Sequence, residues 1–356
     1  MKTTAICALA LTTLSLCTAA RAGHPAAPEP AAMRTWFPED MPGNITLGTK
    51  FSDHLSGIYL DSMLGVWAPK KRDAFLFLNS RYTIEDNDQY IGSSGLGFRK
   101  ITPCKNFIVG ANVYWDAINS AHDNDFNQLG LGLEVLSHWV DARFNYYLPE
   151  DEQYVVGRST ASSSSTFERD TFQNGVQTHS RTETNRRQTF QRHEAGLEGY
   201  NSEIGFLLPG IPARFETRAF VGYYHYDNPF GSDFDGFKAR LETHLLKGVV
   251  ADVEYWDDAS LMGGHWTAEL SASVPFSIEN LIKGRNPFVG FTDCFCLKKR
   301  DLQDRLGDMT IRSHRIQTTT SGNLLTRDQH RTVTTTSQTG ATVQSPRAIG
   351  ISNPLE

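Results

Sequence analysis

Hydrophobic and polar residues alternate along residues 127–148, the most regular stretch of the sequence. A period of two predicts extended strands whose side chains point to opposite faces. In a soluble sheet an apolar face must pack on a second layer, whereas in a membrane it faces lipid and the polar face lines a closed barrel. One face here holds charged residues and glycines, and the apolar face holds Leu129, Leu131, Leu133 and Val135 and, after a break at 136–138, Val140, Ala142, Phe144, Tyr146 and Leu148.

Similar segments recur along the chain, and most have about the 9–11 residues that a tilted strand needs to cross a bilayer. They predict an all-β fold, a transmembrane antiparallel up-and-down β-barrel of about twelve strands over residues 44–276. The segments are Asn44–Ser52, Gly57–Trp67, Asp73–Thr83, Tyr90–Ile101, Phe107–Asp116, Phe126–Leu136, Trp139–Leu148, His193–Ile204, Ala213–Tyr226, Phe234–Leu246, Val249–Trp256 and Gly264–Phe276.

The polar faces of these segments carry many ionisable residues while the opposite faces stay apolar. A soluble sandwich rarely keeps one face so charged over full-length strands, whereas a barrel with a wet, ion-paired lumen does. A solvated sheet face would show the same polarity, so the apolar face separates the two interpretations. The residues expected to line the lumen are Asp141, Arg143, Arg214, Glu216, Arg218, Arg240, Glu242, Asp252, Glu254 and Glu269.

The connections between the segments are alternately short and long, which is typical of outer-membrane barrels whose short turns face the periplasm. The longest connection, residues 149–192, is expected to be a polar surface loop. Aromatic residues fall near both ends of the segments and predict two interfacial girdles. These are Trp67, Trp139 and Phe276 near the short turns, and Trp115, Tyr223, Trp256 and Trp266 near the long loops.

The two ends of the chain differ from its middle. Residues 1–22 contain Lys2, an apolar run and Ala20-Arg21-Ala22, a pattern that predicts a secretory signal peptide removed from the mature protein. The Ala/Pro-rich residues 23–43 are expected to form a periplasmic arm. Residues 277–316 lose the period of two and form a linker, and the Thr/Ser-rich residues 317–356 are expected to be a disordered tail.

Composition and motifs narrow the function. The formal net charge of -6 is modest for 356 residues and argues against nucleic acid as a partner. The sequence has no G-x-S-x-G, no H-E-x-x-H and no phosphate-binding loop, so we expect no catalytic site, no cofactor and no metal site, and the protein is not expected to be an enzyme. His244 beside Glu242 and His265 beside Glu269 are interpreted as polar lining of the lumen.

Three cysteines follow the signal peptide: Cys104, Cys294 and Cys296. So few cysteines exclude a disulfide-dense scaffold, and two neighbouring thiols without further ligands make a weak metal site. A bond between Cys294 and Cys296 would be strained, so the candidate disulfide joins Cys104 to one of them. Both segments are expected near the periplasmic rim, in an oxidising compartment.

Five motifs occur in an order that resembles a known family. In that family they occupy consecutive barrel strands. The chain resembles the β-barrel translocator domain of inverse autotransporters, the group that includes intimin and invasin. The resemblance covers about residues 46–276, with fainter similarity over 298–316, and rests on Gly95–Arg99 (GLGFR), Gly110–Asp116 (GANVYWD), Asn127–Glu134 (NQLGLGLE), Asn145–Pro149 (NYYLP) and Gly196–Tyr200 (GLEGY).

The resemblance implies a barrel in the bacterial outer membrane with its N-terminus in the periplasm. The segment after the last strand then threads the lumen and delivers a C-terminal passenger, often adhesive, to the cell surface. The implied partners are outer-membrane lipid, the barrel-assembly machinery and periplasmic chaperones and, at the surface, a host or surface ligand, and the barrel is expected to be monomeric. Family members carry immunoglobulin-like passengers, whereas only a short polar tail follows Ile316 here, so we expect export of a short segment.

Two alternatives remain open on the sequence alone. One is a porin-like or structural outer-membrane barrel whose surface loops carry the function. The other is a secreted, soluble β-sandwich that binds a ligand. An enzyme would need a nucleophile and a base converging at one rim, and no such pair can be named from the sequence.

Overall fold

The computed structural model describes residues 42–339, apart from 54, 70, 87–88, 151–152, 213, 259–262, 289 and 297–299. The expected signal peptide, nearly all of the N-terminal arm and the end of the tail lie outside the described residues. The chain divides into two compact units, residues 1–152 with 195–319 and residues 153–194 with 320–356.

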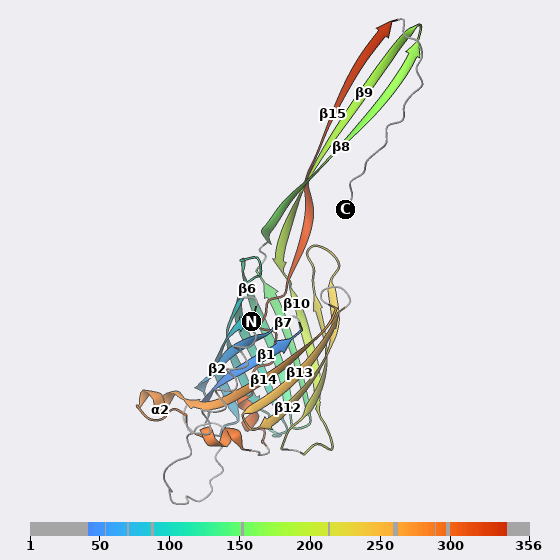
Figure 1. The fold of residues 1–356 in the computed structure, drawn as a ribbon. Helices are drawn as coiled ribbons and strands as arrows, with labels where there is room; N and C mark the ends of the chain where they lie inside the picture. The colour runs from blue at the N-terminus through green and yellow to red at the C-terminus, as the bar shows by residue number, and fades with distance from the viewer. Residues whose placement is uncertain are drawn as a thin grey trace, which may run out of the picture. The chain divides into compact units, whose positions relative to one another are not determined.

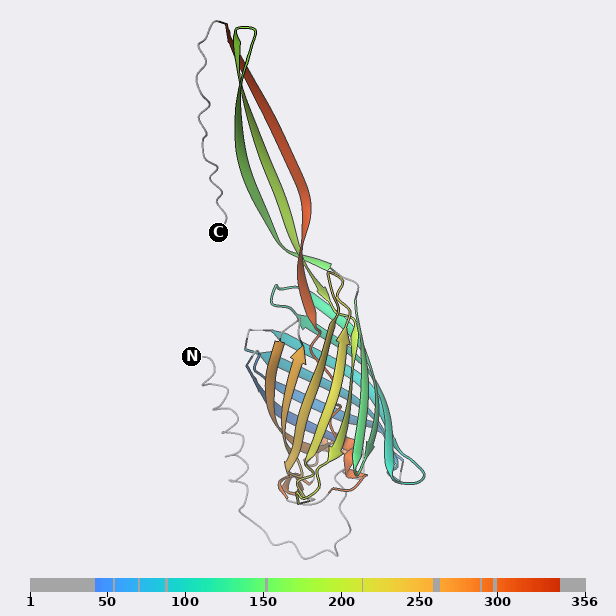
Figure 2. The same ribbon diagram turned by 90° about the vertical axis from the view of Figure 1, so that its right-hand side faces the viewer.

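The first unit is a closed barrel of twelve antiparallel strands, as expected (Figures 1 and 2). The last strand closes on the first, in a register that runs from Pro42 opposite Ser277 to Ser52 opposite Thr267. A single closed wall is not a two-layered sandwich, so the soluble β-sandwich alternative is wrong. The strands are β1 (Pro42–Ser52), β2 (Gly57–Trp67), β3 (Ala74–Glu85), β4 (Tyr90–Ile101), β5 (Phe107–Asn119), β6 (Asp125–Ser137), β7 (Val140–Pro149), β10 (Gly199–Leu207), β11 (Arg218–Tyr226), β12 (Phe234–Leu246), β13 (Val249–Asp258) and β14 (Gly263–Ser277).

Side chains alternate between the outside and the inside of the barrel wall. On β6, Leu133 is 61% exposed and the adjacent Glu134 only 6%. Every strand of the wall exposes at least one large apolar residue, so the outer surface forms a continuous apolar belt suited to lipid. In strand order these residues include Leu47, Leu60, Leu78, Leu96, Val113, Leu133, Phe144, Ile204, Val221, Leu241, Val253 and Leu270.

One residue of the expected aromatic girdles faces the other way. Trp256 is half-buried, and its ring centroid lies 5.1 Å from that of Tyr224, a buried residue. The reason is the period of two, because Trp256 has the same parity along β13 as Asp252 and Glu254 and therefore shares their inward face. Trp67, Trp115, Trp139 and Trp266 are exposed.

The connection between β10 and β11 is longer than the sequence pattern predicts. The strand expected from Ala213 begins only at Arg218. Pro209 and Pro212 lack the N–H that a sheet ladder needs, and Gly210 has a φ of 87°. These residues end strand pairing and leave 208–217 as a connecting loop.

The chain leaves the wall after β14 and returns to its interior. Ser277 caps the short helix α2 (Ile278–Ile282) by accepting a hydrogen bond from the Asn280 N–H. The 3-10 helices η1 (Phe291–Phe295) and η2 (Asp304–Gly307) follow. No helix among the described residues is long and apolar enough to cross a membrane.

The second unit is a three-stranded sheet in the order β15-β9-β8. Strands β8 (Gln153–Gln173) and β9 (Val176–Gly196) form a hairpin, so the expectation of a polar loop over 149–192 is wrong. The hairpin turn is Asn174-Gly175, with φ values of 53° and 77°. These are the left-handed conformations that a tight hairpin turn requires and that Asn-Gly favours.

The third strand of this sheet is β15 (Thr318–Thr339), where the composition predicts a disordered tail. That expectation is wrong over the described part of the tail. It rests on a shortage of apolar residues to bury, and main-chain pairing with β9 needs none. Threonine, which is abundant here, also favours extended structure. The single strand expected over His193–Ile204 is likewise wrong, because the chain passes there from β9 to β10.

Candidate functional site: a segment that crosses the barrel lumen

Residues 300–317, here called the lumen segment, run through the barrel from one rim to the other. At the rim with the short turns, Lys247 Nζ in the β12–β13 turn lies 3.1 Å from Asp304 Oδ1. At the opposite rim, the N–H of Leu197, just before β10, donates to the carbonyl of Gln317 at 2.8 Å. The segment therefore spans the full height of the wall.

Arg305 attaches the first part of the lumen segment to the wall. Its guanidinium binds Asp141 on β7 with both Nη atoms, at 3.0 and 2.7 Å, and also donates to the carbonyl of Ser137. Asp141 is completely buried. A bidentate, charge-assisted contact of this kind fixes both distance and orientation.

Arg300 makes a second attachment next to the first. Its Nε lies 2.7 Å from Glu216 Oε2, and its Nη2 donates to His244 Nε2 at 3.0 Å. The same guanidinium pairs with Asp308 within the lumen segment. Burial alone would raise the pKa of Glu216, but the positive charges around it, that of Arg300 foremost, together outweigh burial and hold that pKa at about 2. The Glu216 carboxylate therefore stays ionised at neutral pH.

The wall also donates hydrogen bonds to the backbone of the lumen segment. Arg99 on β4 is fully buried, pairs with Glu134 on β6 at 2.5 Å, and donates to the carbonyls of Leu306 (2.9 Å) and Asp308. One arginine can satisfy several acceptors because its guanidinium carries five N–H donors in fixed positions. These bonds supply partners to carbonyl groups in a turn that has no regular ladder.

Arg312 attaches the last part of the lumen segment. Both of its Nη atoms lie 2.6 Å from carboxylate oxygens of Asp116 on β5, and its guanidinium stacks 4.5 Å from the ring centroid of Tyr114. Gly130 on β6 makes room for it, because a Cβ there would lie 2.0 Å from Arg312 Nη2. Closer to the rim, Arg315 pairs with Glu85.

An apolar cluster surrounds the segment where it enters the barrel. Burial of these side chains against the incoming chain excludes water from that end of the lumen. The cluster combines residues of the wall with two from the entering chain: Met63, Phe75, Phe77, Ile101, Ile108, Leu136, Cys294 and Leu306.

The lumen segment leaves open space beside β12–β14. Two cavities of about 150 and 210 Å³ lie there, both lined by Arg240, Asp252, Glu254 and Glu269. Arg240 bridges Glu203 and Asp252 at 2.7 and 2.8 Å. The cavities are therefore polar and ion-paired. The arrangement as a whole holds a length of chain in a charged channel, and it presents no paired nucleophile and base among the described residues.

A family model described as "Inverse autotransporter, beta-domain" matches residues 31–255, more than half of the chain. The chain belongs to this family. The resemblance drawn from the five sequence motifs is thereby confirmed, and with it the location in the outer membrane. Inverse autotransporter barrels are not known as enzymes.

One solved structure resembles this inverse autotransporter barrel in fold. One match covers 79% of this chain and 100% of the other, at 14% identity and a TM-score of 0.56, and comes from work on in-meso crystallization of membrane proteins. KdgM porin matches over 64% and 98% at 8% identity and a TM-score of 0.36. CdiB from Acinetobacter baumannii matches over 66% and 60% at 10% identity and a TM-score of 0.31. The first likeness concerns the fold alone, and nothing is concluded from the other two. No curated protein matches the chain.

The structure of the inverse autotransporter barrel gives a position for each residue expected in the lumen. One of them lies elsewhere: Arg214 is exposed in the β10–β11 connection, with its guanidinium 5.0 Å from the ring centroid of Phe215. The expectation for Arg214 is wrong because the strand on which it was placed begins only at Arg218, after a loop in which Glu216 has a φ of 45°. The residues on the lumen side are Asp141, Arg143, Glu216, Arg218, Arg240, Glu242, Asp252, Glu254 and Glu269.

The candidate disulfide does not form. Cys104, Cys294 and Cys296 each keep a thiol. Cys104 shares a 3.1 Å hydrogen bond with Thr102 Oγ1, and Cys294 donates to the carbonyl of Gly290 at 3.6 Å. Cys294 sits inside the apolar cluster at the entry to the lumen, whereas Cys104 is exposed in the β4–β5 turn, so the two thiols occupy different environments.

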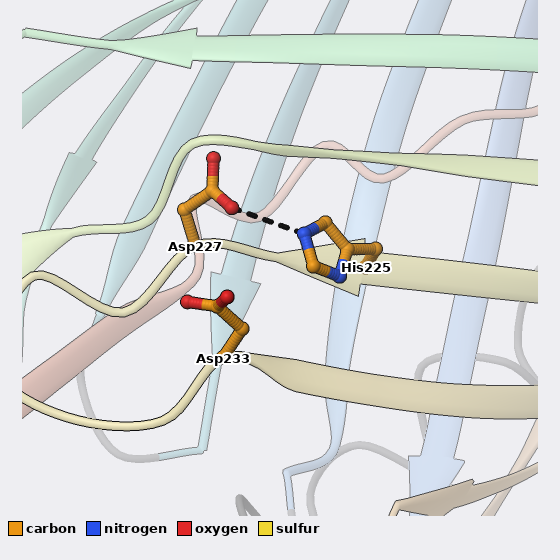
Figure 3. Close-up of side chains that lie close together, drawn as sticks. All are labelled: His225, Asp227 and Asp233. Carbon is orange, nitrogen blue, oxygen red and sulfur yellow. Dashed lines mark hydrogen bonds and ion pairs between the residues drawn. The ribbon is translucent and has the colours of Figure 1, made fainter.

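One group among the described residues brings together atoms that metals favour. His225, Asp227 and Asp233, at the β11–β12 connection, offer ligand atoms within 4.8 Å of one another (Figure 3). The imidazole of His225 is already held between two carboxylates, Asp227 at 3.0 Å and Asp235 at 2.8 Å. Asp233 accepts the N–H of Asn228. These contacts explain the group as an ion-paired loop end, and we assign no metal to it.

Most of the residues that hold the lumen segment were not predicted from the sequence. Asp116 and Glu134 lie on the polar faces of predicted strands, so their parity was an available signal. The arginines of the lumen segment carried no local signal, because their carboxylate partners on the wall lie 84 to 230 residues away in the sequence. The missed residues are Arg99, Asp116, Glu134, Arg300, Arg305, Arg312 and Arg315.

Proposed function

We propose that this barrel exports its own C-terminal segment to the cell surface and afterwards remains plugged by the lumen segment. The observation that carries the proposal is the path of the chain. Strand β14 ends at the rim with the short turns, and Gln317 bonds to Leu197 at the opposite rim. A chain that follows this path delivers everything after Gln317 to the side of the long loops.

The chemistry of the lumen supports the same proposal. A passage for a polar polypeptide has to satisfy backbone and charged groups that lipid cannot. Here the wall offers carboxylates to the arginines of the segment and guanidinium donors to its carbonyls. Together these bonds hold the segment in the lumen. Each bond is modest by itself, so the chain can break and form them one at a time as it moves through the barrel.

We also propose partners for the barrel and for its exported tail. Insertion of the barrel as a monomer would use the barrel-assembly machinery and periplasmic chaperones, and the apolar belt would contact outer-membrane lipid. The displayed segment would be the part that meets a host or surface ligand, which makes adhesion the downstream role of the exported tail.

Cysteine labelling on intact cells tests the direction of export. Thr334→Cys places a thiol in the exposed part of β15, and Cys104 and Cys296 are native thiols at the rim of the short turns. A membrane-impermeant maleimide should modify Thr334→Cys on intact cells and reach Cys104 and Cys296 only after the outer membrane is permeabilised. The Thr334→Ser variant is the matched control. Labelling of Thr334→Cys only after permeabilisation would overturn the proposal.

The porin-like alternative keeps one observation in its favour, the two polar cavities beside β12–β14. If solute passage were the function, the purified barrel should conduct ions steadily with its lumen segment in place. Its tail would then have no need to reach the surface, and the labelling experiment distinguishes the two functions.

A further inference from the structure

We propose that the β8–β9 hairpin is the acceptor for the exported tail, which is captured along the edge of β9 as it leaves the lumen and folds there as β15. The occupant of this edge is residues 318–339 of the same chain. The proposal rests on the proposed export and adds a role for the hairpin that export alone does not require.

The point where the tail leaves the lumen segment also starts its pairing with β9. The Leu197 N–H donates to the carbonyl of Gln317. Leu197 and Ile316, the residue before Gln317, are almost completely buried. Gly196, the last residue of β9, directly precedes Leu197, and Thr318, the first residue of β15, directly follows Gln317. The bond between Leu197 and Gln317 therefore holds the two strands together where they begin to pair, and no long loop has to close before pairing begins.

Pairing continues outward from that contact. Arg192 Nη2 on β9 donates to Thr320 Oγ1 on β15 at 3.4 Å, so residues earlier in β9 meet residues later in β15. The two strands therefore run antiparallel, and each residue that leaves the lumen lies next to the following position on the β9 edge. Sequential pairing of this kind also opposes backward sliding of the tail.

The hairpin can form before the tail arrives. Its turn at Asn174-Gly175 brings β8 and β9 together locally, and side chains bond across it, with His179 Nδ1 2.5 Å from Asp170 Oδ1 and Thr160 Oγ1 3.5 Å from Thr189 Oγ1. Among the residues that the structure describes, no such turn joins β15 to a neighbouring strand. The hairpin is therefore the preformed partner, and the tail is the strand that is added.

The tail needs a partner to be ordered. Residues 326–336 of β15 and 158–173 of β8 are exposed, so no second layer covers these parts of the sheet. A polar strand without a buried face is held mainly by its main-chain hydrogen bonds, which are the hallmark of strand addition to a sheet edge. An unpaired β9 edge would otherwise be open to strands of other molecules.

A cross-linking experiment on the purified barrel tests the capture directly. Arg192→Cys with Thr320→Cys places thiols at two contacting positions, in a background where Cys104 and Cys296 are replaced by Ser and the buried Cys294 is kept. A short bis-maleimide should join the two new thiols in the folded, heat-modifiable barrel. The control pair, Arg192→Cys with Thr334→Cys, places the second thiol roughly 45 Å further along β15 and should not be joined. Equal yields from the two pairs, or none from the first, would overturn the proposal.

Removal of the acceptor gives a second readout. In a variant with residues 153–194 replaced by a short Gly/Ser connection, amide hydrogen exchange over 318–333 should rise to the rate of an unstructured chain, while amides of the lumen segment keep their protection. Protection of 318–333 that survives the replacement would contradict capture by β9. Labelling of Thr334→Cys on intact cells separates this outcome from a failure of export: a tail that is surface-exposed yet unprotected in the parent refutes capture only, and a periplasmic tail refutes export.

Discussion

Arg312 and Asp116 form a bidentate ion pair inside the barrel, with both guanidinium Nη atoms 2.6 Å from a carboxylate oxygen. Asp116 belongs to the wall and Arg312 to the lumen segment, and the two side chains are 0% and 1% exposed. This pair joins a chain that passes through the barrel to the barrel itself. Its removal is therefore the simplest way to ask how firmly the plug is held.

Arg312→Ala should loosen the outer half of the lumen segment without unfolding the wall. Loss of one partner leaves the Asp116 carboxylate buried and unpaired, which costs about 3–5 kcal/mol. The amide hydrogens of residues 308–317 should therefore exchange faster than in the parent protein. Arg181→Ala, which removes an exposed pair with Glu183, is the matched control and should change stability by only about 0–1 kcal/mol. Unchanged exchange in Arg312→Ala would show that this pair does not hold the segment.

Gly130→Ala should have a similar effect by a different route. The added Cβ would lie 2.0 Å from Arg312 Nη2, so the guanidinium has to move away from Asp116. Gly92→Ala is the control, because a Cβ at Gly92 on β4 meets nothing within 4 Å. Exchange over 308–317 should rise in the first variant and stay at the parental rate in the second. Identical behaviour of the two variants would argue against steric exclusion at Gly130.

Leu131→Arg should impair insertion of the barrel. Leu131 is 43% exposed on the outer wall, and an arginine facing lipid at the bilayer midplane costs about 2–4 kcal/mol. The folded, heat-modifiable fraction in outer membranes should fall. Val155→Arg adds the same charge at an exposed position of β8, outside the barrel unit, and should be close to neutral. A Leu131→Arg barrel that inserts at the parental level would contradict a lipid-facing position.

The three thiols should react according to their surroundings. In the purified folded barrel, maleimide should modify the exposed Cys104 and Cys296 and should reach the buried Cys294 only after denaturation. The hydrogen bond from Thr102 lowers the pKa of Cys104, so this thiol should react fastest near neutral pH. Gel migration should be the same with and without reductant. A change in gel migration on reduction would indicate a disulfide and would contradict this prediction.

The period of two was sufficient to predict the wall. Leu131 and Leu133 face outward and Glu134 inward because strand geometry alone decides it. The same rule, applied to Trp256, would have placed that ring inside with Asp252 and Glu254. Arg214 was misplaced because the expected strand began at Ala213, whereas β11 begins only at Arg218. The error at Trp256 comes from local information that was present in the sequence.

Other features lie beyond the reach of local pattern. Arg305 and Asp141 meet across a sequence separation of 164 residues, and nothing near either residue indicates the other. The tail was expected to be disordered because its composition offers little to bury, yet it pairs with a strand that ends at Gly196. A strand that is held by main-chain pairing with a distant strand needs no alternation of apolar and polar residues, so its sequence does not predict that it is a strand.

Planar-bilayer conductance tests the central claim, that the chain after β14 occupies the lumen. The full-length barrel should show small and infrequent current steps, because the lumen segment leaves only the cavities beside β12–β14. A chain that ends at Ile282, checked for heat-modifiable folding, should open a wide and stable pore. Equal conductance of the two proteins would mean that residues 300–317 do not fill the barrel, and it would contradict the account.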